Sequence, residues 1–171
     1  MLPDRKDEYY KGEEEWLSAV TAAMRTEYRT IVDAGFILQI DDARAATAFD
    51  RMVPPGTFEE YRRWLAKFVE SLNHALEGIP EDRVRYHVCW GSWPGPHVSD
   101  VALKDIVDLI LKVRAGAYVI ESANPRHEHE WQVWKNVKLP AGQDAHSGRH
   151  QPCHQRGRAS GTDRRTHHAL R

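Results

Sequence analysis

The chain has 171 residues and a formal net charge of -1 at pH 7, with 41% hydrophobic and 29% charged residues. This length allows one ordinary domain, and the charge gives no reason to expect a nucleic-acid or membrane partner. No apolar run approaches the roughly 18 residues of a membrane-spanning helix, and the polar residues 1–11 do not resemble a secretory signal. Cys89 and Cys153 lie in different surroundings, so we expect a cytoplasmic protein whose thiols are free or bind metal.

The composition changes sharply after Gly142. Residues 143–171 contain no Val, Ile, Phe, Met, Trp or Tyr, and hold five of the ten histidines. Such a segment cannot bury enough apolar surface to offset the entropy cost of ordering it. We therefore predict a structured domain over residues 1–142 and a disordered tail over residues 143–171. The tail histidines lack a repeated ligand spacing, which favours disorder over a metal site.

The first 142 residues alternate between predicted helices and strands. Apolar residues at helical spacing predict three helices, at Glu14–Asp33, Phe58–Leu76 and from Ser99 or Asp100 to Val113. Apolar or alternating runs predict three strands, at Gly35–Ile40, Arg83–Trp90 and Ala117–Ile120. Gly35 can end the first helix, and Thr57 with Glu60 forms a capping box that begins the second.

Strict alternation of this kind implies parallel strands joined by right-handed crossovers. A doubly wound sheet and a (β/α)8 barrel both fit the pattern. No glycine-rich dinucleotide fingerprint follows a predicted strand, which disfavours the doubly wound sheet. A complete barrel usually takes about 250 residues, so we predict an α/β fold that is part of such a barrel.

Each predicted strand ends in polar side chains: Asp41 and Asp42, then His87 and Cys89, then Glu121. The carboxyl ends of barrel strands form the active-site face. Because His87 and Cys89 are two residues apart on a strand, they project to the same side. Imidazole, thiolate and carboxylate groups are all zinc ligands. The alternatives are a buried Cys89 that only packs, a helix start or a turn at the two aspartates, and an ion pair of Glu121 with an arginine.

Two further segments, one rich in glycine and proline and one that contains two histidines, are candidates for a function. The glycine- and proline-rich stretch Trp90–His97 follows the His-x-Cys strand and is either an active-site loop or a rigid connector. The stretch Arg126–Trp131 contains two histidines without the helical His-Glu-x-x-His spacing of metalloproteases. We expect this second stretch to be the solvent-exposed start of a helix.

Three segments resemble consecutive parts of the catalytic domain of cobalamin-independent methionine synthase, and above all its short single-domain relatives. They are Gly35–Asp42 (GFILQIDD), Tyr86–Ser92 (YHVCWGS) and Tyr118–Pro125 (YVIESANP). The resemblance covers roughly Asp7 to Gly142. It implies a (β/α)8 barrel with a catalytic zinc, in which His87, Cys89 and Glu121 match three of the four zinc ligands. Asp41 matches the carboxylate that holds the amino group of homocysteine.

The resemblance also implies the chemistry. Zinc would bind the thiol of homocysteine as a thiolate, which attacks the methyl group of a methylfolate and forms methionine. His97 or His127 could protonate the folate nitrogen as it leaves. The sequence departs from the family at Asp42-Ala43, where Glu-Pro is frequent, and this leaves the substrate open. The fourth ligand, a cysteine on a late strand, has no counterpart, because Cys153 lies too early and in a different context.

Several functions compete with this one. A zinc thiol alkyltransferase with another acceptor, such as the coenzyme M transferases, would use the same ligands. The related uroporphyrinogen decarboxylase barrel uses no metal, and the set His87, Cys89 and Glu121 argues against it. A nonfunctional fragment or an interaction partner is the non-enzyme alternative. Because one ligand is missing and strand edges are open, we expect the chain to be inactive alone and prone to aggregate.

The tail is predicted to be a frameshift product. With suitable codons, Gln143–Pro152 read one base out of frame gives KMLIPGVIS, an apolar strand-like run where a barrel needs its next strand. The following stretch, Pro152–His167, gives HATNVVEHPELIAER, which has a helical pattern and resembles the family's continuation. Sequencing the gene tests this prediction, and codons incompatible with these strings would refute it.

Overall fold

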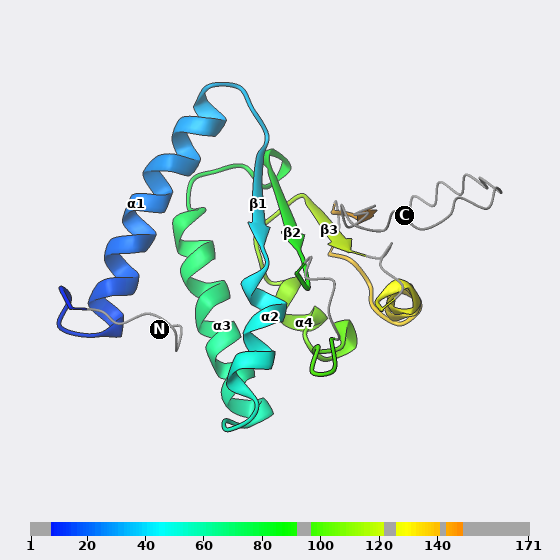
Figure 1. Ribbon diagram of the computed structural model, residues 1–171. Helices are drawn as coiled ribbons and strands as arrows, with labels where there is room; N and C mark the ends of the chain where they lie inside the picture. Colours follow the sequence, from blue (N-terminus) through cyan, green and yellow to red (C-terminus); the bar gives the residue numbers. More distant parts are fainter. Residues whose placement is uncertain (1–7, 92–96, 122–125, 141–142, 149–171) are drawn as a thin grey trace, which may run out of the picture.

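The computed structural model describes residues 8–91, 97–121, 126–140 and 143–148. Figure 1 shows how the helices and strands of these residues are arranged. The α-helices are α1 (Glu13–Asp33), α2 (Arg44–Met52), α3 (Phe58–Ala75) and α4 (Val107–Ile110). The strands are β1 (Leu38–Asp42), β2 (Val84–Val88), β3 (Ala117–Glu121) and β4 (Asp144–Gly148). Three 3-10 helices complete the set: η1 (Glu81–Arg83), η2 (Leu103–Asp105) and η3 (Glu128–Lys135). None of the described helices is long and apolar enough to cross a membrane.

The strands form one parallel sheet in the order β1-β2-β3-β4. Consecutive strands are neighbours, as right-handed crossovers in a singly wound sheet require. In register, Asp41 lies beside His87, and His87 beside Val119. The predicted α/β class with parallel strands is confirmed. The sheet is open, with β1 and β4 at its edges, and the described residues do not form a closed barrel.

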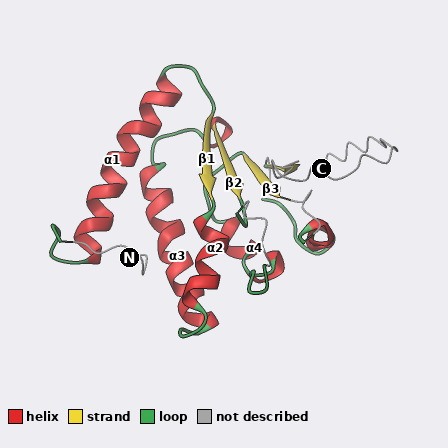
Figure 2. Ribbon diagram, viewed as in Figure 1, coloured by secondary structure: helices red, strands yellow, loops and turns green. Residues whose placement is uncertain are grey.

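The two faces of the sheet differ in character. One face carries buried apolar side chains: Leu38, Val84, Tyr86, Val88, Tyr118 and Ile120. Helices α1 and α3 lie on one side of the strands and α2 lies beyond the carboxyl end of β1 (Figures 1 and 2), and α1 packs against α3. The opposite face alternates with the first and carries polar groups such as Gln39, Asp41 and Arg85, all exposed. His87 lies next to Tyr86 in β2, so the same alternation places its side chain on the polar face, opposite that of Tyr86.

The predicted boundaries of two helices are confirmed by their capping interactions. Gly35 has φ +90 after α1, its N–H donates to Val32 O, and the Phe36 N–H donates to Ile31 O. These two bonds are the left-handed Schellman ending that favours glycine. At α3, the Glu60 N–H donates to Thr57 Oγ1 and the Thr57 N–H donates to Glu60 Oε2. This reciprocal pair is the capping box that the sequence predicts.

Helix α2 was not predicted from the sequence. Its nine residues, Arg44–Met52, are too few for a clear apolar period. The side chain of Asp42 begins the helix, because its Oδ1 accepts from the N–H groups of Arg44 and Ala45, each at 2.8 Å. The alternative that the aspartate pair starts a helix is therefore correct for Asp42.

The predicted third helix, from Ser99 or Asp100 to Val113, is confirmed only over Val107–Ile110, and its predicted start is wrong. The structure has η2 at Leu103–Asp105 and a single turn of α-helix, α4, at Val107–Ile110. Ala102 has extended backbone (ψ 142), and the carboxylate of Asp100 binds two histidines instead of capping a helix. Tertiary contacts of Asp100 thus outweigh its local preference for a helix start.

The predicted disorder of residues 143–171 is wrong for Asp144–Gly148, which form β4 beside β3. Ala145 is buried at 7% exposure. Backbone hydrogen bonds to a neighbouring strand do not depend on large apolar side chains. A prediction of disorder from side-chain composition therefore missed this strand. The remaining tail, Cys153 included, lies outside the described residues.

Candidate functional site

The carboxyl ends of β1, β2 and β3 bring together the predicted site residues, which we call the strand-end cluster: Asp41, His87, Cys89 and Glu121. The Cys89 thiol lies 3.5 Å from Glu121 Oε2 and donates to it across the β2–β3 boundary. The N–H of Gly91 donates to Cys89 Sγ at 3.2 Å. The loop after β2 thus turns its backbone toward the sulfur, where Gly91 has φ +87. The pairing of thiol and carboxylate that the strand ends predict is present.

His87 is held by the neighbouring strand. Its Nδ1 lies 2.9 Å from the carbonyl oxygen of Val119, and the residue is 7% exposed. A bond from Nδ1–H to a backbone carbonyl fixes the ring and selects Nε2 as the nitrogen for a metal. Convergence of all three ligand atoms of His87, Cys89 and Glu121 on one point stays a prediction. Among the described residues, the three-ligand group with atoms within 4.8 Å of one another is a different one.

The two neighbouring aspartates have separate roles. Asp41 is exposed on the polar face of the sheet, and its Oδ1 accepts from Gln39 Nε2 at 2.6 Å. Asp42 is 5% exposed, and its Oδ2 accepts from the Tyr86 hydroxyl at 2.5 Å. Burial raises the pKa of Asp42, and the bond from Tyr86 partly offsets this. Asp41 therefore remains available to a ligand, whereas Asp42 ties β2 to the start of α2.

The Cys89 thiol is held in its protonated form. Burial raises the pKa of Cys89, and the nearby negative charge of Glu121 raises it further, while the N–H of Gly91 acts in the opposite direction. A thiolate is the form that binds a metal. A cation placed between the thiol and Glu121 would reverse this electrostatic effect.

A second group of polar side chains lies after β2 and β3, and we call it the loop cluster: His97, Asp100, His127 and Glu130. Asp100 Oδ2 lies 2.8 Å from His97 Nδ1 and 2.9 Å from His127 Nε2. On the other side of its ring, His127 Nδ1 lies 3.3 Å from Glu130 Oε2. The ligand atoms of His97, Asp100 and His127 lie within 4.8 Å of one another, so these residues could hold a metal ion.

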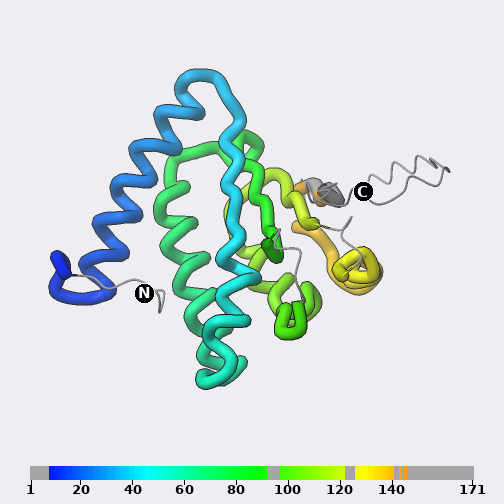
Figure 3. Tube along the Cα trace, in the orientation of Figure 1, coloured from blue at the N-terminus to red at the C-terminus, as the bar shows by residue number. Residues whose placement is uncertain are grey.

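The expectation that Arg126–Trp131 is solvent-exposed is wrong for two of its residues. His127 is 4% exposed and Glu130 is 7% exposed. The segment forms the start of η3, beyond β3 in the trace of Figure 3. Three-residue spacing puts His127 and Glu130 on the same side of this 3-10 helix. The i, i+3 spacing of His127 and Glu130 was a local pattern that could have indicated their contact. No local pattern could have indicated the contact of His127 with Asp100, because 27 residues separate them.

The electrostatics of the loop cluster favour a charged His127. Burial by itself lowers the pKa of His127, but hydrogen bonds to Glu130 and Asp100 outweigh it, and the pKa is raised. The ring also stacks on Trp90, with centroids 4.6 Å apart. Trp90 is itself fixed by a bond from its Nε1 to the carbonyl oxygen of Val101 at 2.7 Å. The loop cluster is thus a series of polar contacts that runs from His97 through Asp100 and His127 to Glu130, with the ring of Trp90 stacked on His127.

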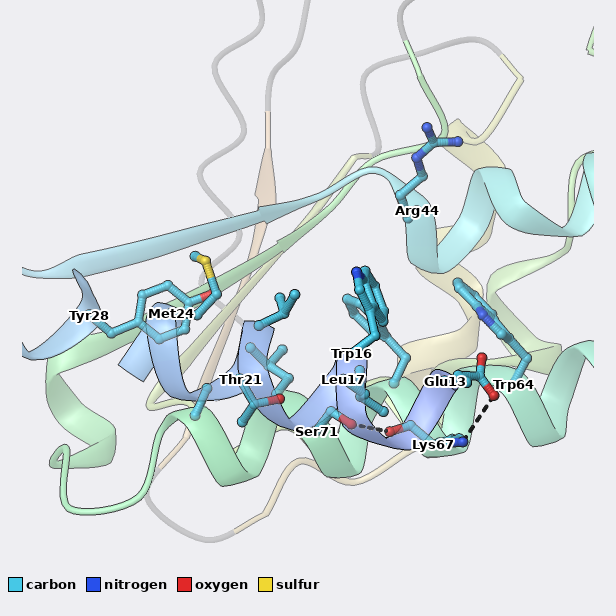
Figure 4. A pocket seen from close by; sticks show the side chains of 14 residues that line it. Glu13, Trp16, Leu17, Thr21, Met24, Tyr28, Arg44, Trp64, Lys67 and Ser71 are labelled. Atoms are coloured by element: carbon cyan, nitrogen blue, oxygen red, sulfur yellow. Dashed lines mark hydrogen bonds and ion pairs between the residues drawn. The ribbon is translucent and has the colours of Figure 1, made fainter. Parts of the chain in front are cut away.

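The apolar cavity in Figure 4 lies away from both clusters, between α1, α3 and the start of α2. Its volume is about 200 Å³. Its walls are mainly apolar, with Trp16, Met24 and Trp64 among them, and Lys67 at one end bonds to Glu13. The carboxylate among its lining residues, that of Glu13, is paired with Lys67, and no residue of either cluster lines the cavity, so we assign it no part in the site.

In comparisons with known proteins, no protein-family model, no curated protein and no solved structure matches this chain.

Proposed function

We propose that this chain carries part of the active site of a zinc-dependent thiol methyltransferase of the cobalamin-independent methionine synthase type. His87, Cys89 and Glu121 would hold the zinc ion, and Asp41 would bind the amino group of homocysteine. The methyl donor would be a methylfolate and the product methionine. The observation that carries the proposal is the contact of Cys89 with Glu121 at adjacent ends of parallel strands.

The distance within this pair fits a shared zinc ion. Zinc bonds of about 2.3 Å to sulfur and about 2.1 Å to oxygen, at a tetrahedral angle, place the two ligand atoms about 3.6 Å apart. The observed separation of Cys89 Sγ and Glu121 Oε2 is 3.5 Å. The ring of His87, oriented by Val119 O, has the backbone support that metal-binding histidines usually have.

In this proposal, the residues of the chain have separate roles in metal binding, substrate binding and structural support. A zinc ion would supply the positive charge that keeps a substrate thiol deprotonated near neutral pH. Asp41, exposed one strand away from His87 in register, offers a carboxylate to an ammonium group. Asp42 and Tyr86 hold the end of β1 in place through their buried bond. The sheet is open, and the lack of turnover by the chain alone stays a prediction.

Cobalt substitution tests the metal site. The chain with Cys153→Ser, which leaves Cys89 as the only thiol, is titrated with Co²⁺ and its absorption spectrum recorded. We expect a thiolate-to-cobalt charge-transfer band that disappears with Cys89→Ser and weakens with Glu121→Gln. The exposed Glu128→Gln serves as the matched control. A spectrum that does not depend on Cys89 would overturn the proposal.

Substrate binding is tested on the same cobalt-loaded chain. Homocysteine should change the cobalt spectrum because its sulfur joins the metal, whereas homoserine, which has a hydroxyl in place of the thiol, should not. Asp41→Asn should weaken the homocysteine response without changing the metal affinity. A response to homocysteine that is equal in the Asp41 variant would remove Asp41 from the site.

A further inference from the structure

The loop cluster shares no residue with the strand-end cluster and is built from different segments. His97 and Asp100 lie between β2 and η2, and His127 and Glu130 lie at the start of η3. The side chains of His97 and His127 are 7% and 5% exposed, and that of Asp100 is 19% exposed. Two imidazoles and a carboxylate are thus withdrawn from solvent, with Asp100 at the more open side.

The contacts converge in the way that a metal site requires. Two imidazole nitrogens, His97 Nδ1 and His127 Nε2, face one oxygen of Asp100, at 2.8 and 2.9 Å. A proton lies in each of these contacts when no metal is bound. A cation placed among the three atoms would replace the protons and bind both nitrogens and the carboxylate at once.

Glu130 supplies an independent sign of a metal-binding arrangement. Its Oε1 accepts from the N–H of Leu103 at 2.7 Å. Its Oε2 is buried without a hydrogen-bond partner, although it lies 3.3 Å from His127 Nδ1. With a metal on Nε2, the neutral ring must carry its proton on Nδ1, which then points to this carboxylate oxygen. A carboxylate behind a histidine is the usual support of a metal-bound imidazole.

We propose that His97, Asp100 and His127 form a second metal site for a divalent first-row transition ion, with Glu130 orienting His127. The donor set decides the class of metal, because two imidazoles and one carboxylate suit zinc, iron, cobalt or nickel better than magnesium or calcium. Trp90, stacked on His127, connects the site to Cys89, its neighbour in the segment after β2. The site does not depend on the proposed methyltransferase function.

The test uses the full chain in a background that removes other ligands. The background contains Cys89→Ser, Cys153→Ser and glutamine at four tail histidines: His150, His154, His167 and His168. Zinc is titrated into this protein by calorimetry, with the circular dichroism of each variant as a check on folding. We expect one equivalent of zinc, which is lost with Asp100→Asn and with His127→Gln. The exposed neighbour His129 gives the matched control, and His129→Gln should bind as the background does.

Glu130→Gln separates an orienting residue from a ligand. The stoichiometry should stay at one equivalent, and the affinity should fall by roughly 10- to 100-fold, as for other residues that support a metal-bound histidine. The unsubstituted chain provides a measurement independent of folding defects in variants. On addition of zinc, the ring nitrogen signals of His97 and His127 should shift in ¹⁵N NMR spectra, and that of His129 should not.

The proposal is overturned if zinc binding in the background is absent, or if it is unchanged by both Asp100→Asn and His127→Gln. It is also overturned if the ring nitrogens of His97 and His127 do not respond to zinc. Failure of this site is distinguishable from failure of the proposed function. The cobalt–thiolate band requires Cys89, which the calorimetric background lacks.

Discussion

The strand-end cluster and the loop cluster lie next to each other, yet they are built in different ways. The strand-end cluster takes its side chains from the ends of three parallel strands, and one contact, from Cys89 to Glu121, joins two of its members directly. The loop cluster comes from the segment before η2 and from the start of η3, and its four members are joined by contacts of 2.8–3.3 Å. In the first, Asp41 is exposed on the polar face of the sheet, whereas His87 and Glu121 are 7% and 3% exposed. In the second, a single series of contacts joins all four members.

The two clusters differ in what holds their side chains in position. Strand side chains are positioned by the backbone hydrogen bonds of the sheet, so they need no contact with one another to stay in place. Loop side chains lack that support and are ordered by their mutual hydrogen bonds and by burial. We therefore expect substitutions in the loop cluster to affect stability, and substitutions in the strand-end cluster to affect ligand binding and reactivity.

The largest expected effect is on Glu130. Glu130→Ala removes the acceptor of the Leu103 N–H and leaves the buried His127 with only one of its two carboxylates, that of Asp100, so the free energy of unfolding should fall by about 3 kcal/mol. Asp41→Ala in the strand-end cluster and the exposed Glu128→Ala should each change it by less than about 0.5 kcal/mol. Urea unfolding in metal-free buffer measures these values. Equal losses for Glu130 and Asp41 would contradict the comparison.

Tyr86→Phe tests the one strand-end carboxylate that has a structural role. The substitution leaves Oδ2 of buried Asp42 without the hydroxyl that donates to it, which should cost about 1–3 kcal/mol of unfolding free energy. Tyr9→Phe, at a residue 86% exposed, is the control and should have little effect. A loss no larger than that of the control would mean that the bond contributes nothing net.

His127 should make stability depend on pH. Burial acts to lower its pKa, but the bonds to Glu130 and Asp100 prevail and raise it. Its stabilising contribution is therefore complete below the unfolded pKa of about 6.5 and is lost as pH rises through the folded pKa. In chelator, the stability difference between the natural chain and His127→Gln should shrink as the pH rises above about 6.5. A difference that grows with pH would contradict this sign.

The smallest expected effect concerns the Cys89 thiol. Burial raises its pKa, and the charge of Glu121 raises it further, so Glu121→Gln should lower the pKa and speed alkylation by iodoacetamide at a fixed pH. The assay uses the Cys153→Ser background and a pH–rate profile, with Glu128→Gln as control. An unchanged profile would show that burial alone sets the reactivity of the thiol.

The regular elements could be predicted wherever a local pattern was strong. The two long helices, the left-handed Gly35 and the capping box of Thr57 follow from side-chain periodicity and short-range hydrogen bonds, and all are present. Helix α2 and strand β4 escaped prediction because each is short. The first is started by a carboxylate from outside it, and the second is formed by pairing with β3.

The candidate sites also divide into one that a local sequence pattern predicted and one that no local pattern predicted. Alternation along β2 and the polar ends of three strands were enough to select Asp41, His87, Cys89 and Glu121 from the sequence. No local pattern joined His97 and Asp100 to His127, because the contact between Asp100 and His127 spans 27 residues. The prediction of an exposed start for η3 was wrong for the same reason.

The sequence by itself determined the alternation of helices and strands, the parallel sheet and the residues at its carboxyl ends. These features depend on backbone geometry and side-chain period, which act over a few residues. Only the tertiary structure decided that Asp42 is structural while its neighbour Asp41 is exposed, and that Asp100 binds two histidines instead of starting a helix. Both outcomes depend on which groups lose water on folding, because a buried carboxylate must find donors wherever the chain brings them.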